Sequence, residues 1–121
     1  MAGSLRILCA EDNAQMGELL IHFLISAGHV AVHARDGLEA WAILSRDLQA
    51  FDVLITDHQM PGMSGLQLAQ LACEANFAGG IIVHSANVTT VDATQYRTCG
   101  VRRILPKMTS ASILLQAVEA D

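Results

Sequence analysis

The chain has 121 residues, of which 52% are hydrophobic and 16% charged, and its net charge is −5. That length suits one domain around a single core, and the apolar composition excludes intrinsic disorder. The acidic balance and the 4% of aromatic residues argue against a nucleic-acid partner, since phosphates need a basic surface and bases need rings to stack on. No apolar run reaches the roughly 18 residues of a membrane span, and the N-terminus does not read as a signal peptide.

The spacing of the cysteines indicates the redox compartment, and the basic residues are almost all of one kind. Cys9, Cys73 and Cys99 are widely spaced, odd in number and without a Cys-x-x-Cys pair. This spacing predicts free thiols in a reducing cytosol, so we expect a cytoplasmic protein without a membrane partner. No histidine stands at zinc-ligand spacing from a cysteine. Lys107 is the only lysine, because six of the seven basic residues are arginine.

Short apolar runs alternate with amphipathic segments along the chain. The runs predict strands at 5–10, 30–33, 53–56, 81–83 and 101–105. Apolar residues at helical spacing predict helices near 16–27, 38–48, 68–75, 89–98 and 110–120. Asn13 is expected to cap the first helix and Gly28 to end it. One face of the first helix is expected to carry the apolar residues Met16, Leu19, Leu20, Phe23, Leu24 and Ala27. The last helix is expected to point the following residues inward: Ile113, Leu114, Ala117 and Val118.

The order of these elements is strand then helix, five times over. The strands lack polar alternation, which is typical of a parallel sheet covered on both faces. With right-handed crossovers, we expect a doubly wound (βα)5 α/β fold with a five-stranded parallel sheet. A ferredoxin-like fold is disfavoured because a helix follows every strand.

Polar side chains follow four of the predicted strands, at the edge where ligands bind in such sheets. The first strand leads to Glu11 and Asp12, the third to Asp57, the fourth to Ser85 and the fifth to Lys107. Three convergent carboxylates repel one another unless a cation is present, and oxygen ligands suit Mg²⁺. We expect the lysine opposite them to pair with Asp57 when the site is empty and to bind an incoming phosphate, to which the hydroxyl would donate. The sequence therefore predicts a metal-dependent phosphoryl-transfer site with Asp57 as nucleophile, and leaves the donor open.

Four segments carry a resemblance that covers essentially the whole chain: 7–13, 54–65, 83–86 and 105–107. Together they resemble the response regulator receiver domain of two-component signalling. The resemblance implies a flavodoxin-like strand order of 2-1-3-4-5. It also implies that residues 1–121 form a single receiver domain, with no output domain in this sequence.

The resemblance further implies a role for each matching residue. Asp57 would accept a phosphoryl group from a phosphohistidine on a sensor histidine kinase or a histidine phosphotransfer protein. Asp12 and Asp57 would bind Mg²⁺ directly, with Mn²⁺ as a substitute, Glu11 would bind it through water, and Gln59 through its backbone carbonyl. The residues that would contact the phosphoryl oxygens are Ser85 and Lys107.

Other positions would tune the switch. Ala86 is small and would keep the phosphate pocket open, while Gln59 and Asn87 would lie beside the attacking water and set the lifetime of the phosphate. His58 follows the nucleophile directly and is expected to point away from it, because successive strand side chains alternate. The phosphorylated form would change conformation and bind an unidentified effector, as a monomer or a weak phosphorylation-dependent dimer, and dephosphorylation would reset it.

The sequence departs from the family in two places. The usual Lys-Pro dipeptide is absent, since Met108 follows Lys107, so we predict a trans peptide bond there. Ile104 occupies the position of the family's usual aromatic switch residue. We therefore predict that the output signal does not depend on the rotation of an aromatic side chain at this position.

The sequence leaves three alternatives to a stand-alone switch. The chain could be the phosphate-relay receiver of a hybrid histidine kinase, or a pseudo-receiver that binds partners without being phosphorylated. A phosphatase of the haloacid dehalogenase type also uses an aspartate nucleophile on a parallel sheet. That family needs a second aspartate two residues later as general acid, where this chain has Gln59.

Overall fold

The structure is a computed structural model that describes residues 3–120. Within that range the chain forms a parallel sheet in the order β2-β1-β3-β4-β5, which confirms the predicted fold and strand order. The strands are β1 (Arg6–Ala10), β2 (Val30–Ala34), β3 (Val53–Thr56), β4 (Gly80–His84) and β5 (Arg103–Leu105). The helices are α1 (Ala14–Ser26), α2 (Gly37–Arg46), α3 (Gly65–Glu74), α4 (Thr90–Thr98) and α5 (Ala111–Glu119), with a short 3₁₀ turn, η1 (Leu48–Ala50).

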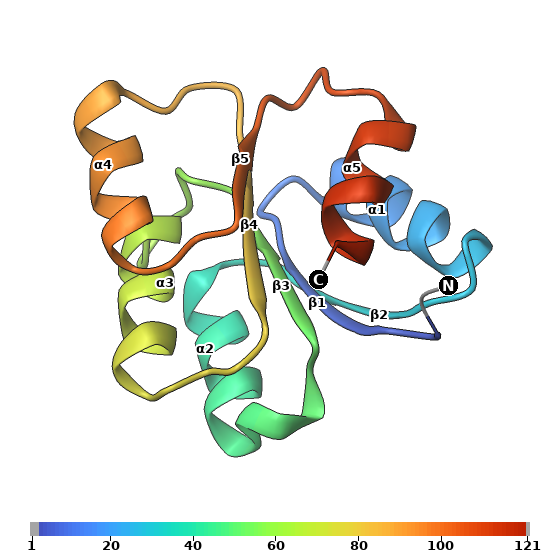
Figure 1. The fold of residues 1–121 in the computed structure, drawn as a ribbon, viewed down its shortest axis with the longest axis horizontal. Coiled ribbons are helices and arrows are strands. Elements are labelled where there is room, and N and C mark those ends of the chain that lie inside the picture. The colour runs from blue at the N-terminus through green and yellow to red at the C-terminus, as the bar shows by residue number, and fades with distance from the viewer. Residues whose placement is uncertain (1–2, 121) are drawn as a thin grey trace.

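Two layers of helices cover the sheet: α1 and α5 lie on one face, and α2, α3 and α4 on the other (Figure 1). Alternate residues of a strand enter opposite cores. In β1, Ile7 and Cys9 pack toward Leu24 of α1, whereas Leu8 packs in the cluster that holds Leu44 of α2. Because helices cover both faces of the sheet, the central strand β3 is buried along its whole length and carries the largely apolar sequence Val-Leu-Ile-Thr.

The predicted ends of the first helix are confirmed. The Asn13 side chain accepts a hydrogen bond from the Met16 N–H at 2.9 Å, and Gly28 has a φ of 95°, a conformation that favours glycine. The inward orientation of Leu19 and Ile113 is wrong, since they are 66% and 45% exposed. Each helix buries a narrower stripe against the sheet, and these two residues lie beside it. The buried residues are Gly17, Leu20 and Leu24 in α1, and Leu114, Ala117 and Val118 in α5.

Two predicted elements end or begin at a different residue in the structure because of a local hydrogen bond. The second helix ends at Arg46, and residue 48 begins η1, because Asp47 is extended and its carboxylate accepts a hydrogen bond from the Gln49 N–H. Strand β5 begins at Arg103 rather than 101, since Val101 still donates to the Tyr96 carbonyl at the end of α4. No cis peptide bond occurs among residues 3–120, which confirms the trans bond predicted between Lys107 and Met108.

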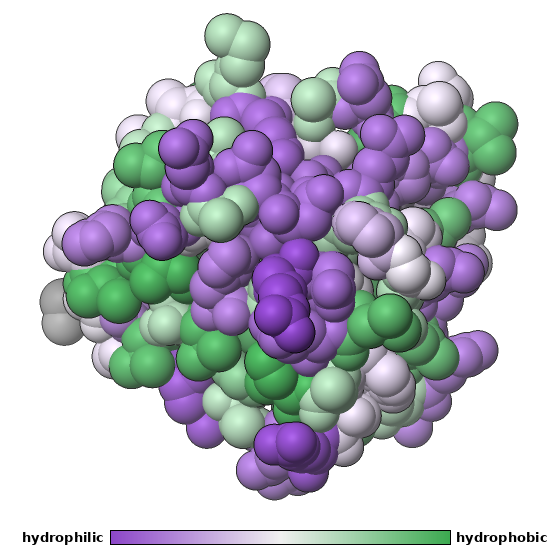
Figure 2. All heavy atoms as spheres, turned by 180° about the vertical axis from the view of Figure 1, so that it is seen from behind, coloured by the Kyte–Doolittle hydropathy of each residue, from purple (hydrophilic) through white to green (hydrophobic). Residues whose placement is uncertain are grey.

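The surface carries apolar residues in separate places. Figure 2 shows one face on which hydrophobic patches are broken up by hydrophilic side chains. The large apolar residues that are exposed are Leu19, Ile25, Val30, Val32, Leu38, Val91, Met108 and Ile113. Scattered exposure of this kind is ordinary for a protein surface. No helix within the described residues is long and apolar enough to cross a membrane.

Candidate functional site

Three carboxylates meet where β1 and β3 end. Ala10 and Thr56 are register partners in the sheet, so the residues that follow them leave the same edge side by side. The Asp57 N–H donates to the Ala10 carbonyl at 2.9 Å, which continues the pairing one residue beyond the strands. One carboxylate oxygen from each of Glu11, Asp12 and Asp57 lies within 4.8 Å of the others. Glu11 and Asp57 are buried and Asp12 is exposed, so the cluster opens to solvent on one side.

Lys107 bridges the two buried carboxylates. Its Nζ lies 2.8 Å from Asp57 Oδ2 and 2.9 Å from Glu11 Oε1. The lysine follows β5 in a turn in which the Thr109 N–H donates to the Pro106 carbonyl at 2.9 Å. An ammonium so placed offsets the repulsion between the two carboxylates. The pairing of Lys107 with Asp57 matches the sequence-based expectation, whereas the equal approach to Glu11 is a finding of the structure.

The two buried acids respond differently to this site. Burial disfavours ionisation of Asp57, but hydrogen bonds from Lys107 and from the His58 N–H outweigh it and hold its pKa below the ordinary value. Burial dominates at Glu11 and raises its pKa, although Lys107 and the Asn13 N–H oppose that shift. Burial also opposes the charge on Lys107, yet hydrogen bonds to both carboxylates raise its pKa above the ordinary value. Of these two buried acids, Asp57 is therefore the one that stays ionised more readily.

The carboxylate of Asp57 is oriented from several sides. Its Oδ1 accepts a hydrogen bond from the His58 N–H at 2.7 Å, while Oδ2 faces Lys107. The Thr56 hydroxyl donates to the Asp57 carbonyl at 2.8 Å. Ser85 is buried at the end of β4, and its hydroxyl contributes to the lowered pKa of Asp57. The predicted nucleophile, lysine and hydroxyl thus come together in one place.

The remaining predicted residues lie at the rim. The side chains of Gln59, Ala86 and Asn87 are exposed, on the loops that follow β3 and β4. Ile104 is partly buried and packs against the core shared by α2, α3 and α4.

Two histidines hold the loops of the site, and reasoning from the sequence missed both contacts. The His33 Nε2 lies 2.8 Å from the Glu11 carbonyl, with its ring against Gly17, where a Cβ would lie 2.3 Å away. His58 points away from the carboxylates, as predicted, and reaches α4. Its Nδ1 lies 2.6 Å from the Tyr96 hydroxyl and its Nε2 3.1 Å from Asp92 Oδ2. The signal in the sequence for the His58 contacts was that the one tyrosine falls in a helix made mainly of polar residues.

Comparison with known proteins agrees with this geometry. A sequence model described as the response regulator receiver domain matches residues 7–119. The chain belongs to this family. Receiver domains act in two-component systems, where they take part in phosphorylation-dependent signalling with histidine kinases and effectors.

The individual relatives differ in their sequence identity to this chain and in how much of each chain is matched. A response regulator receiver protein from Pseudomonas putida has a solved structure 31% identical in sequence, with a TM-score of 0.90 and full coverage of both chains. The receiver protein CpdR of Brucella abortus is 39% identical over 57% of this chain and 56% of its own length. The transcriptional regulatory protein TctD of Salmonella typhimurium is 30% identical over 85% of this chain and 45% of its own length. For CpdR, TctD and two further curated relatives, the matched region spans 28% to 56% of the relative's own length.

Receiver domains generally bind Mg²⁺ at an acidic pocket, and the residues of this chain fit that ion. The donors of Glu11, Asp12 and Asp57 are all oxygens, as Mg²⁺ prefers. The exposure of Asp12 leaves room for the water ligands that Mg²⁺ retains.

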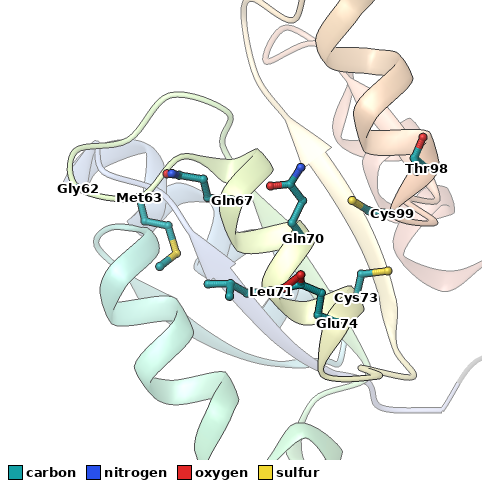
Figure 3. Close-up of a pocket in the computed structure, with 9 residues that line it drawn as sticks. All are labelled: Gly62, Met63, Gln67, Gln70, Leu71, Cys73, Glu74, Thr98 and Cys99. Carbon is teal, nitrogen blue, oxygen red and sulfur yellow. The ribbon is translucent and has the colours of Figure 1, made fainter.

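Apart from the acidic cluster, a hollow of about 640 Å³ lies between α3 and α4 (Figure 3). It is lined by Leu71 and Cys73 of α3, by Thr98 of α4 and by Cys99, which follows α4, and it holds none of the clustered carboxylates.

Proposed function

We propose that this receiver domain is a phosphorylation-dependent switch in which Asp57 accepts the phosphoryl group of a phosphohistidine. The observation that carries the proposal is the bridge from Lys107 Nζ to the carboxylates of Asp57 and Glu11, at 2.8 and 2.9 Å, beside the exposed Asp12. This arrangement provides a nucleophile, a cation and a solvent-facing acidic cluster at one point. A turn or a helix cap would need none of these together.

In the proposed reaction, a carboxylate oxygen of Asp57 attacks phosphorus, the N–P bond of the donor breaks, and the electron pair returns to the imidazole. The product is an acyl phosphate on Asp57. Lys107 would leave the carboxylate to pair with the phosphoryl oxygens, and the Ser85 hydroxyl would donate to them. Fixed donors that meet developing charge lower the barrier of such transfers. Attack by water on the acyl phosphate would release inorganic phosphate and restore the carboxylate.

Mg²⁺, or Mn²⁺ in its place, would neutralise charge on the transferred phosphoryl group. Asp12, Asp57, Glu11 and the backbone carbonyl of Gln59 are the groups we propose to hold it. Exposed Ala86 leaves space over the site, and exposed Asn87 is placed to affect the lifetime of the phosphate. The partners are a sensor histidine kinase or a histidine phosphotransfer protein, and an effector that recognises the changed surface.

Incubation with acetyl phosphate and Mg²⁺, followed by mass spectrometry of the intact chain, tests the proposal. The expected result is one added phosphoryl group that hydroxylamine removes. Asp57→Asn should abolish the addition, whereas Asp52→Asn, at the opposite end of β3 and paired with Arg6, should leave it unchanged. A wild-type chain that stays unmodified would favour a pseudo-receiver that only binds partners. Phosphotransfer from candidate kinases then separates a terminal switch from a relay.

A further inference from the structure

Helix α4 has the weakest apolar attachment to the fold among the five helices of the described residues. Tyr96 is the single residue between Thr90 and Thr98 that is buried. Figure 3 shows that the end of α4, at Thr98 and Cys99, is separated from α3 by the hollow described above. The placement of α4 therefore depends on Tyr96 and on the polar contacts near it.

Those polar contacts form a bridge, which we define as His58, Tyr96 and Asp92. The neutral imidazole with its proton on Nε2 satisfies all three groups, because the Tyr96 hydroxyl donates to Nδ1 at 2.6 Å and Nε2–H donates to Asp92 Oδ2 at 3.1 Å. The other neutral tautomer would set an unprotonated nitrogen against a carboxylate. Asp92 also belongs to the capping box of α4 with Thr89. The bridge thus holds both the first turn and the buried tyrosine of α4.

The same histidine is tied to the phosphoacceptor through its backbone. Its N–H donates to Asp57 Oδ1 at 2.7 Å, and its carbonyl accepts from the Gly65 N–H at 2.8 Å at the start of α3. The Tyr96 hydroxyl also lies beside Gly65, since a Cβ added to that glycine would lie 2.9 Å from the hydroxyl oxygen. One residue therefore separates the carboxylate that would be phosphorylated from α4. Ile104, on β5, offers no aromatic ring for this purpose.

We propose that His58 is a positioning residue that couples the phosphorylation state of Asp57 to the placement of α4 through Tyr96 and Asp92. The inference rests on the proposed function. The bridge is present together with the Lys107–Asp57 ion pair, so it stabilises the unphosphorylated arrangement. Phosphorylation removes charge from the oxygen that accepts the His58 N–H, and the backbone at 57–58 would pass that change to the imidazole. Coupling of this kind acts equally in both directions.

The test uses the full chain with Mg²⁺ and beryllofluoride, a phosphoryl mimic, monitored by backbone amide chemical shifts. In the wild type we expect shifts around Asp57 and Ser85 and also across Thr90–Thr98. Tyr96→Phe keeps the ring and removes the hydroxyl, so the shifts in α4 should be lost while those around Asp57 persist. Beryllofluoride should bind about fivefold more tightly or better, because the opposing bridge is gone.

Thr94→Val is the matched control, since it also removes a hydroxyl from α4, one that bonds only within its own helix, to the Thr90 carbonyl. It should behave as the wild type. His58→Gln is the second variant, because it keeps the backbone N–H and alters only the bridge, and it should reproduce Tyr96→Phe.

An undiminished α4 response in a folded Tyr96→Phe or His58→Gln variant overturns the proposal, as does an equal loss in Thr94→Val. Absence of any shift around Asp57 in the wild type overturns the proposed function instead, and the coupling with it.

Discussion

Replacing Lys107 by methionine would leave Glu11 and Asp57 facing each other without their shared cation. Methionine keeps most of the aliphatic stem, so the change isolates the charge. Removing one partner of a buried ion pair costs about 3–5 kcal/mol. Because the lysine side chain is 21% exposed, we expect about 3 kcal/mol of destabilisation, at the lower end of that range. Urea unfolding at pH 7 without divalent cations measures it, with Arg103→Met, an exposed cation on β5, as the matched control.

The pH dependence of this loss follows from the sign of each shift. Lys107 lowers the pKa of Glu11 and of Asp57, so in the variant both folded pKa values rise. A carboxyl whose pKa is raised by folding loses stability as the pH rises through that pKa. The difference in the free energy of unfolding between the wild type and Lys107→Met should therefore be largest near neutral pH and should decrease on acidification. Equal stabilities of Lys107→Met and Arg103→Met at pH 7, or a gap that widens in acid, would refute the reasoning.

Three further predictions concern the surrounding framework. Gly65→Ala would place a Cβ 2.0 Å from the Asp57 carbonyl, so we expect about 2 kcal/mol of destabilisation in urea, and a variant as stable as the wild type would contradict this close approach. Arg102→Met removes guanidinium hydrogen bonds at 3.1 and 3.3 Å to the Ala117 and Val118 carbonyls, so thermal unfolding should show a loss of about 1 kcal/mol, with faster hydrogen exchange at the end of α5. Hydrogen bonds from Arg6 lower the pKa of Asp52, so Asp52→Asn should be slightly less stable than the wild type at pH 7. The difference should begin to shrink as the pH falls below the ordinary value of 3.8 and should fade as the pH passes the lowered pKa of folded Asp52; a difference that grows on acidification would contradict this assignment.

The fold was predictable because the strands carry no polar alternation. A strand such as β3, with the sequence Val-Leu-Ile-Thr, is apolar on both sides only when helices cover both faces of the sheet. Parallel topology then brings all the strand ends to one edge. For that reason Glu11, Asp12 and Asp57 could be placed together without coordinates, and the expected pairing of Lys107 with Asp57 is confirmed.

What the sequence did not disclose depends on how the helices dock. Helical spacing identifies an apolar stripe but not how much of its width the sheet covers, so Leu19 and Ile113 were placed inward and are exposed. The contacts of His58 with Tyr96 and Asp92 join residues 38 and 34 positions apart, and they exist only because α4 lies beside the start of α3. The approach of Lys107 to Glu11 likewise depends on the path of one loop.

The scarcity of lysine has a practical consequence. The chain holds a single side-chain amine, and in the structure that amine is paired with two carboxylates. Acylating reagents attack only the unprotonated amine, and this pairing raises the pKa of Lys107. The acylation rate at that one position, read by mass spectrometry, therefore reports whether the ion pair is intact. Kinases, metals and effectors could be screened against the unmodified sequence in this way, without introducing a fluorophore or a tag.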